Sequence, residues 1–212
     1  MQSVKVTWHG HSCFSVENQG QITVFDPYDS AWINYPPLAV KAHRILVSHQ
    51  HGDHNFAAAV QMLPPAPSFE KLSVQTVETS HDDTGGKKRG RNLIHVLKTG
   101  GLSIVHLGDL GHILTPEQIS AIGQPDLLLI PVGGIYTLDA GQAWQVIAQL
   151  KPGNIAPMHY NPGLFETPLA PVETFLALTP AGWTIKKLTG NTVILYGSEQ
   201  GQCLVFQYQP IL

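Results

Sequence analysis

Residues 48–54, with the sequence Ser-His-Gln-His-Gly-Asp-His, constrain the fold of this chain more than any other stretch. They place three histidines and one aspartate directly after an apolar run, residues 44–47, which we predict to be a short buried strand. In a helix these side chains would be spread around the circumference, because only residues three or four positions apart share a face. In a loop they can converge, so we expect a strand that ends in a polar loop.

The side chains of this loop are of the types that bind metal ions. Zinc, manganese and iron accept imidazole and carboxylate ligands. His49 and His51 can point in one direction, while Asp53 and His54 point in another. The alternative is a polar surface loop that happens to be rich in histidine. Because the pattern His-x-His-x-Asp-His is far more specific than a single histidine, we favour a metal site.

The size and composition of the chain fit one globular domain with a sizeable core. It has 212 residues, of which 43% are hydrophobic and 13% charged, as in ordinary globular proteins. The formal net charge of −3 gives no field that would attract nucleic acid or an anionic membrane. The count of 11 histidines against 12 lysines and arginines agrees with a metal site.

Neither the cysteines nor the N-terminus indicates a secreted protein. Cys13 and Cys203 are far apart and form no Cys-x-x-Cys pair, so neither a disulfide framework nor a thiolate zinc site is indicated. Residues 1–5 lack the basic and apolar regions of a signal peptide. No apolar run is long enough to cross a bilayer. We therefore expect a soluble, cytoplasmic protein with no membrane partner.

The first half of the chain is predicted to consist mainly of strands, since apolar and polar residues alternate between turn signals. Residues 56–63 are predicted to form a short helix that ends at Pro64. Residues 28–39 are predicted to be a loop, in which Trp32 and Tyr35 could form a lid or simply pack. The predicted strands are residues 4–8, 13–16, 22–25, 72–77, 92–97 and 102–107.

The second half is predicted to alternate helices and strands. Thr115, Pro116 and Gln118 are an N-cap threonine, a proline at the first helical position and a glutamine at the third, which together start a helix. Asp139 and Gln142 cap the next helix. This order of elements fits two sheets with helices outside them. The remaining predicted elements are strands at 126–130, at 155–158 and near 184, 193 and 204, and a helix near 172–178.

Three further residues of metal-binding types each follow a predicted strand directly. They are His81, Asp109 and His159. Catalytic and metal-binding groups are common at strand ends, because a rigid element fixes them there. Each alone could be a structural residue, but together with residues 48–54 they supply seven ligands for two metal ions.

The string His-x-His-x-Asp-His at residues 49–54 resembles the signature of the metallo-β-lactamase superfamily of binuclear metal hydrolases. That superfamily continues with a histidine, a Gly-Asp pair and a final histidine, the order of His81, Asp109 and His159. The resemblance covers nearly the whole chain. It implies a single domain, residues 1–212, with the α/β (α+β) fold of a four-layer αββα sandwich.

The resemblance also implies which residues hold the metals. Metal one would be bound by His49, His51 and His81, and metal two by Asp53, His54 and His159, with Asp109 as a bridge. We expect two divalent ions, zinc first and manganese or iron as alternatives, because a carboxylate bridge makes the site harder than a thiolate would. Two ions about 3.5–4 Å apart would hold a hydroxide at neutral pH. Asp53 would orient this nucleophile as a catalytic residue.

A closer resemblance is to the ascorbate-6-phosphate lactonase-like branch of the superfamily. Zinc β-lactamases of the commonest type have a cysteine where this chain has Asp109, and Cys203 lies beyond His159. Antibiotic hydrolysis is therefore not expected. The motifs that suggest the branch are at residues 10–12, 26–27, 108–111, 131–137 and 157–160.

Three residues are weaker candidates. His11 could point into the pocket as a catalytic residue that donates to substrate, or it could be a buried histidine bonded to backbone. Asp26 could accept a hydrogen bond from a ligand imidazole, or simply begin a turn. His112 could be a general acid, although a capping or surface role is favoured. The histidines predicted to be structural are His9, His43, His95 and His106.

Two loops could contact a substrate. The basic run at residues 87–91, Lys-Lys-Arg-Gly-Arg, lies just after His81 and could reach an anionic substrate, or it could be a solvated turn. Gly133 and Gly134 could present backbone N–H groups to a phosphate or carboxylate, or form a plain turn.

The sequence therefore predicts a binuclear metal-dependent hydrolase that acts on a small, anionic ester, lactone or phosphoester. The alternative is a phosphodiesterase or nuclease, as in some branches of the superfamily, but the chain lacks the basic charge and long substrate-binding arm expected of one. A redox or metal-binding protein without turnover is a further alternative, against which the chain contains no flavin domain. The sequence leaves a homo-oligomer open.

Overall fold

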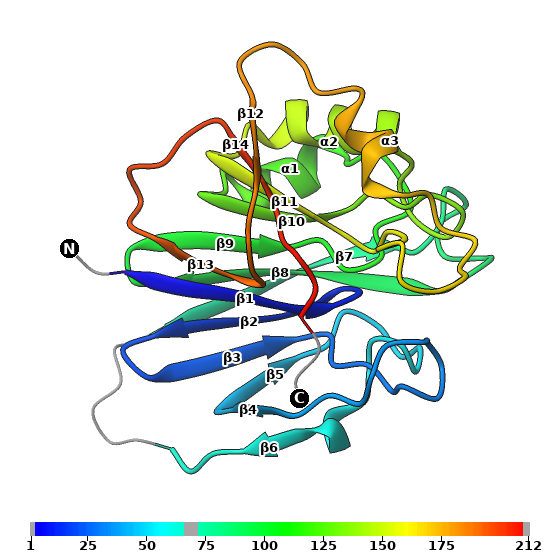
Figure 1. Cartoon of the computed structure of the whole chain (residues 1–212). Coiled ribbons are helices and arrows are strands. Elements are labelled where there is room, and N and C mark those ends of the chain that lie inside the picture. The colour runs from blue at the N-terminus through cyan, green and yellow to red at the C-terminus, as the bar shows by residue number, and fades with distance from the viewer. Residues whose placement is uncertain (1–2, 66–71, 210–212) are drawn as a thin grey trace.

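The computed structural model describes residues 3–65 and 72–209, in which two large sheets lie one above the other (Figure 1). The smaller sheet has five strands in the order β13-β1-β2-β3-β5. Its hairpins β1-β2 and β2-β3 are antiparallel, as the turn signals predict, while β3 and β5 are parallel. The strands are β1 (Val4–Gly10), β2 (Cys13–Asn18), β3 (Gln21–Phe25), β5 (Arg44–Leu46) and β13 (Thr192–Leu195).

The larger sheet has seven strands in the order β12-β14-β11-β10-β9-β8-β7. Strands β9, β10, β11, β14 and β12 run parallel, and β7, β8 and β9 are antiparallel. Every residue of β10 is buried, as its unbroken apolar run predicts. The strands are β7 (Ser73–Ser80), β8 (Arg91–Thr99), β9 (Leu102–His106), β10 (Leu127–Pro131), β11 (Asn154–Met158), β12 (Thr184–Lys187) and β14 (Gln202–Val205).

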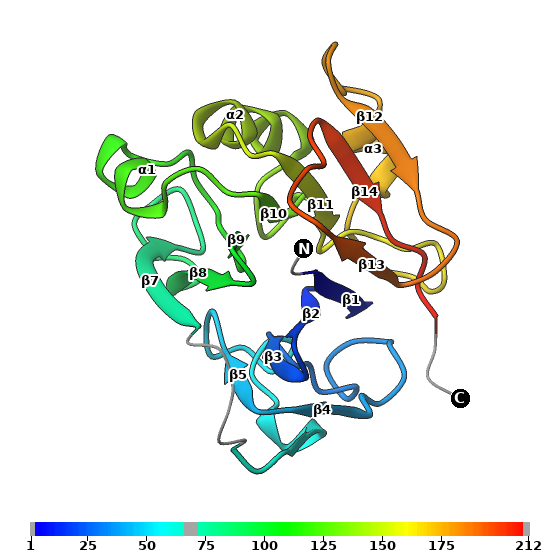
Figure 2. The same cartoon turned by 90° about the vertical axis from the view of Figure 1, so that its left-hand side faces the viewer.

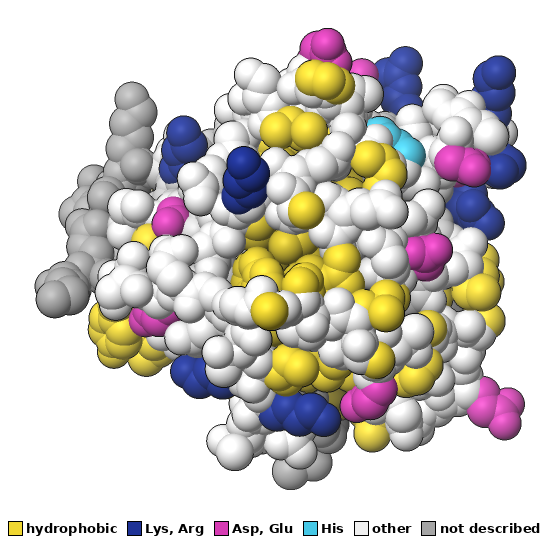
Figure 3. Space-filling model, turned by 90° about the horizontal axis from the view of Figure 1, so that it is seen from above, with side chains coloured by type: hydrophobic (Ala, Val, Ile, Leu, Met, Phe, Trp, Pro, Cys, Tyr) yellow, Lys and Arg dark blue, Asp and Glu magenta, His cyan; other side chains and the backbone are white. Residues whose placement is uncertain are grey.

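Three helices, α1 (Pro116–Ile122), α2 (Ala140–Leu150) and α3 (Val172–Leu176), cover the outer face of the seven-stranded sheet (Figures 1 and 2). The capping boxes predicted for the first two are present, with Thr115 and Asp139 as N-caps. From this side, hydrophobic side chains occupy the middle of the surface and most charged ones its margin (Figure 3). No helix among the described residues is long and apolar enough to cross a membrane.

The prediction of a helix at residues 56–63 is wrong. A single 3-10 turn, Ala57–Ala59, is followed by strand β6 (Val60–Met62), which pairs in parallel with β4 (Val40–Ala42). An isolated helix of this length is marginal, whereas the extended chain gains ladder hydrogen bonds and buries Val60. As a result, the layer outside the five-stranded sheet is made by β4, β6 and the 3-10 turn within the described residues, and the helices lie on the other side.

The main hydrophobic core lies between the two large sheets. It unites β1 and β2 side chains, such as Trp8 and Phe14, with those of the larger sheet, such as Ile94 and Ile130. A second core, which includes Val24, packs the other face of the small sheet against β4 and β6. Burial of these apolar surfaces is the dominant stabilising term, so both sheets are held as one support for the loops that follow their strands.

Candidate metal centre

The predicted site residues converge because six strands end at the same edge of the molecule. Strands β7, β9, β10 and β11 point in one direction within the large sheet, and β3 and β5 are parallel in the small one. Their loops gather at one side (right in Figure 1). The chain thus brings Asp26, residues 48–54, His81, Asp109 and His159 together, although they span most of the sequence.

The first group of potential ligands consists of His49, His51 and His81. One ligand atom from each lies within 4.8 Å of the others. The ring of His49 is 4.6 Å from that of His51 and 4.8 Å from that of His81, centroid to centroid. Three imidazoles at these separations can share one cation, as the sequence predicts for metal one.

The second group has four members, which are Asp53, His54, His159 and His11. His11 lies at the turn between β1 and β2 and adopts a φ of 50°, a conformation that is uncommon for residues other than glycine. Its Nε2 lies 3.4 Å from Oδ2 of Asp53, and its ring centroid is 4.3 Å from that of His159. The ring therefore points into the site, and the main chain of His11 makes the local contact by accepting from Nε1 of Trp8.

Asp109 lies between the two groups. Its Oδ2 is 3.2 Å from Nε2 of His81 and 3.9 Å from Nε2 of His49, both in the first group. The same oxygen is 3.2 Å from Nε2 of His159 and 3.3 Å from Nε2 of His54, in the second. A single buried oxygen in contact with both groups is the arrangement expected of a bridging carboxylate.

Asp26 is fully buried and holds side chains of the cluster in place by hydrogen bonds. Its Oδ2 accepts hydrogen bonds from Nδ1 of His54 at 2.8 Å and from Oγ of Ser48 at 2.6 Å. The Ser48 hydroxyl also contacts Nδ1 of His49 at 2.9 Å. Asp26 therefore accepts a hydrogen bond from an imidazole of the site, as the first of its two alternatives predicted. Ser48 was not predicted, and its only signal was its place directly before His49.

The buried polar atoms at the site fit a metal cation. Within the described residues, Nε2 of His11, His49 and His54 and Oδ1 of Asp109 are buried and have no hydrogen-bond partner. Unpartnered buried polar atoms are costly, so several at one point require an explanation, and a bound cation would satisfy them together. Because Asp26 holds Nδ1 of His54, the free nitrogen is the one that faces Asp109.

The electrostatics of His49, His11 and Asp109 agree with this fit. Burial and the neighbouring His54 lower the pKa of His49 to about 3, and burial and His159 lower the pKa of His11 to about 4. Both rings are therefore neutral at pH 7, the form that binds metal. Burial would raise the pKa of Asp109, but His159 and His54 outweigh it and hold that pKa well below its ordinary value. The carboxylate is thus ionised, as a ligand must be.

The ligand groups line a cavity of about 480 Å³. Among the described residues, the Trp32 side chain is two-thirds exposed. Its indole ring lies against Gly52, since a Cβ added at Gly52 would be 2.5 Å from that ring. Trp32 is thus a wall of the cavity, whereas Tyr35 is buried and packs against Phe165. The cavity is lined by His11, Trp32, Ile33, His51, Asp53, His81, Arg89, Asp109, Tyr136, His159 and residues 167–169.

Known proteins agree with this fold. The family described as "Beta-lactamase superfamily domain" matches residues 5–159 of the chain. A protein of known structure from Thermotoga maritima, assigned to the Zn-dependent hydrolases of the metallo-β-lactamase superfamily, is 33% identical in sequence. The match covers 97% of this chain and 100% of that one, with a TM-score of 0.76. The chain belongs to the metallo-β-lactamase superfamily.

Relatives within the superfamily carry the name UPF0173 metal-dependent hydrolase. The one from Thermoplasma acidophilum is 29% identical over 84% of this chain and 92% of its own length. The one from Thermoplasma volcanium is 30% identical over 74% of this chain and 84% of its own length. The predicted fold class is thereby confirmed as that of the superfamily.

The other histidines contact the main chain or a hydroxyl and belong to neither ligand group. His95 and His106 contact the carbonyl oxygens of Val47 and Ser12 through Nε2, at 2.9 and 2.8 Å. His112 accepts from the backbone N–H of Ser80, which leaves it a structural role. His43 accepts from the N–H of Ile22, and His9 contacts the Ser15 hydroxyl.

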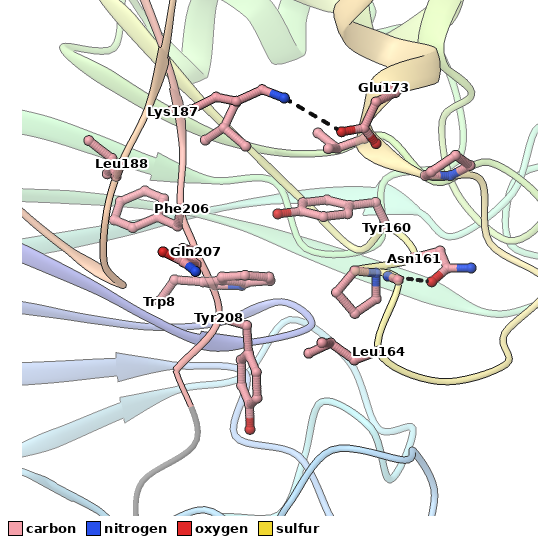
Figure 4. Close-up of a pocket in the computed structure, with 15 residues that line it drawn as sticks. Trp8, Tyr160, Asn161, Leu164, Glu173, Lys187, Leu188, Phe206, Gln207 and Tyr208 are labelled. Carbon is pink, nitrogen blue, oxygen red and sulfur yellow. Dashed lines mark hydrogen bonds and ion pairs between the residues drawn. The ribbon is translucent and has the colours of Figure 1, made fainter.

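A second cavity, of about 580 Å³, is lined by no residue of either ligand group (Figure 4). The ring of Trp8 stacks on that of Tyr160 with centroids 5.6 Å apart, and Tyr208 lies edge-on to Trp8. Lys187 and Glu173 form an ion pair of 3.8 Å beside these rings. Although this cavity is larger, it has no group for the chemistry of the superfamily, so the cavity above the His/Asp cluster is the candidate active site.

Proposed function

We propose that the protein is a binuclear metal-dependent hydrolase that acts on a small, anionic ester, lactone or phosphoester. The observation that carries the proposal is the position of Asp109, whose Oδ2 contacts histidines of both ligand groups at the base of one cavity. Membership of the superfamily and the names of its relatives support metal-dependent hydrolysis. The likeness to the lactonase-like branch supports a phosphorylated lactone as one candidate substrate.

The proposed ligands follow the two groups, with zinc as the first choice of metal. His49, His51 and His81 would hold one ion, Asp53, His54 and His159 the other, and Asp109 both. When bound, two such ions supply Lewis acidity and a water nucleophile at neutral pH. His11, as the fourth member of the second group, is available either as an additional ligand or as a donor to substrate.

The chain itself would orient the nucleophile and handle its proton. The side chain of Asp53 is 24% exposed and lines the cavity, so its carboxylate can orient the attacking water and accept its proton. His11 faces the same carboxylate at 3.4 Å and can fix its orientation. The walls formed by Trp32 and Leu169 would limit the access of bulk water to the reacting bond.

A panel of substrates tests this proposal. Protein purified without added metal should contain close to two metal ions per chain by elemental analysis, as expected for a binuclear site. It should hydrolyse small anionic esters, lactones or phosphoesters, lose activity on chelation and regain it with zinc or manganese. Hydrolysis of RNA in preference to these small substrates would favour the nuclease alternative, and no metal-dependent hydrolysis of any of them would refute the proposal.

A further inference from the structure

We propose that Arg89 binds an anionic group of the substrate, a carboxylate or a phosphate, and so makes the enzyme select anionic over neutral esters. The inference rests on the proposed hydrolase function and specifies which residue of the basic run at 87–91 recognises the substrate.

The loop that carries Arg89 is built around the carboxylate of Asp82, which is 2% exposed. Oδ1 of Asp82 accepts from the backbone N–H groups of Thr84 and Gly86 and from the Thr84 hydroxyl, at 2.7 to 2.9 Å. Oδ2 accepts from the N–H groups of Lys88 and Arg89, at 2.9 and 2.8 Å. These charge-assisted bonds fix the main chain of Arg89 itself. The loop is therefore a rigid support directly after His81, and not a free solvated turn.

A second loop holds the guanidinium group at the cavity. Nη2 of Arg89 donates to the carbonyl oxygen of Ile135 at 3.2 Å, and the group lies over the ring of Tyr136, 5.5 Å from its centroid. Ile135 has a φ of 62°, a conformation that β-branched residues rarely adopt. The strained turn is held by the bond from the N–H of Tyr136 to the oxygen of Gly134, at 2.7 Å. Strain of this kind persists where the surrounding structure enforces it, often at binding sites.

Arg89 differs from Lys88 and Arg91 in charge balance, and from the rest of the basic run in its position at the cavity. Lys88 is paired with Asp83 at 2.9 Å, and Arg91 is paired with Glu78 at 3.8 Å. Among the residues that the structure describes, no carboxylate lies within ion-pair distance of the Arg89 guanidinium. It is also the basic residue of the run that lines the cavity of the metal cluster. Its charge is therefore available to a ligand in that cavity.

The rest of the cavity wall indicates the form of the substrate. Trp32, Ile33, Pro168 and Leu169 line the cavity with apolar surface. One N–H of the planar guanidinium is occupied by Ile135, and the others can bind two oxygens of a carboxylate or phosphate at once. The substrate would thus carry an anionic group at Arg89, a short apolar body against these walls and a scissile ester bond over the metal cluster.

A comparison of two matched esters tests the inference. 4-Nitrophenyl hydrogen glutarate carries a carboxylate where 4-nitrophenyl valerate has a methyl group, and the two are otherwise alike. Arg89→Gln should lower kcat/KM for the glutarate ester on the order of tenfold, as expected on loss of a charge-assisted contact, and change it much less for the valerate ester. Arg91→Gln, which removes a paired arginine outside the cavity, is the matched control and should leave both values unchanged.

Metal content and thermal unfolding are measured for each variant, because Arg89 also joins two loops. Equal losses on both esters, or no loss on either, would overturn the inference and leave Arg89 as a structural tether. If wild-type protein hydrolyses no ester, lactone or phosphoester, the proposed function fails, and binding then decides the role of Arg89.

Binding is measured by calorimetry with glutaramate and 4-phosphonobutanamide, two unreactive amides with a carboxylate or a phosphonate, and with neutral valeramide. Arg89→Gln should lower the affinity for the preferred anionic amide on the order of tenfold. The affinity for valeramide should not change. The preferred amide distinguishes a carboxylate substrate from a phosphorylated one. Equal affinity of wild type and variant for both anionic amides would refute the inference independently of turnover.

Discussion

Nδ1 of His54 donates a hydrogen bond of 2.8 Å to Oδ2 of Asp26, and both side chains are fully buried. The same oxygen accepts from the hydroxyl of Ser48, which contacts His49. His54 and His49 belong to different ligand groups. One carboxylate therefore orients a histidine in each group, directly in one case and through a serine in the other.

Replacement of Asp26 by Asn should weaken metal binding at both groups. The amide presents one acceptor oxygen without charge, so it cannot hold His54 and Ser48 as the carboxylate does. Loss of such a supporting contact typically lowers metal affinity by 10–100-fold, and we expect about that loss in competition titrations with a chelator. The matched control is Asp139→Asn at the exposed N-cap of α2, where Asn caps as well as Asp. Equal metal affinity in the two variants would contradict this role.

Replacement of Asp109 by Ala should lower the occupancy of both metal positions, because its Oδ2 contacts histidines of both groups. His51→Ala should instead affect mainly the first group, to which it belongs. Elemental analysis gives the metal content of each variant, with His43→Ala as the control that retains it, since His43 accepts from a main-chain N–H outside the cluster. Full metal content in the Asp109 variant would refute the bridging assignment, and loss in the His43 variant would show that the ligand set is misread.

Features encoded locally could be predicted from the sequence. The capping boxes at Thr115 and Asp139 each depend on residues within one helical turn, and the structure contains both. The position of residues 48–54 after a short strand followed from an apolar run and its polar end. His81 could be placed at the site because it follows a strand directly, and parallel strands end at one edge of a sheet.

Features that depend on distant contacts could not be predicted. The helix expected at residues 56–63 is replaced by β6, because pairing with β4 decided the conformation and local propensity did not. The two alternatives for Asp26 could be separated only by the distance to His54, 28 positions away. Arg89 could not be distinguished from Arg91, since only its contacts with Ile135 and Tyr136 place it at the cavity.

Replacement of Gly108 by Ala should destabilise the protein and disturb the metal site together. Gly108 has a φ of 56°, and a Cβ there would lie 2.3 Å from Oδ1 of Asn92 and 2.5 Å from Cβ of Ser48. Asn92 accepts from the N–H of Asp109, so the clash would displace the bridging residue. Gly20→Ala is the control, because its φ is 81° and nothing lies within 4 Å of its Cβ position.

The control should lose only the backbone cost of an alanine at positive φ, about 1 kcal/mol, in urea unfolding. Gly108→Ala should lose clearly more and should also bind metal less tightly, as measured by chelator competition. A loss no larger than that of the control, with metal affinity intact, would show that the site tolerates the extra methyl group.

Replacement of Cys203 by Ala should reduce the alkaline destabilisation of the protein. Burial raises the pKa of the Cys203 thiol from 9.0 to about 12, so between these pH values the unfolded chain releases a proton that the folded chain retains. Because the folded state then binds more protons, this thiol makes the free energy of unfolding fall as pH rises above 9, by about 1 kcal/mol at pH 10.

Cys203→Ala should be less stable than wild type at pH 7, where it loses packing, yet its stability should fall less steeply between pH 8 and pH 10. Buried tyrosines such as Tyr160, whose pKa burial also raises, act equally in both proteins, so the difference isolates the thiol. Urea unfolding at several pH values measures it, and parallel pH dependences would show that Cys203 ionises as readily in the folded chain as in the unfolded one.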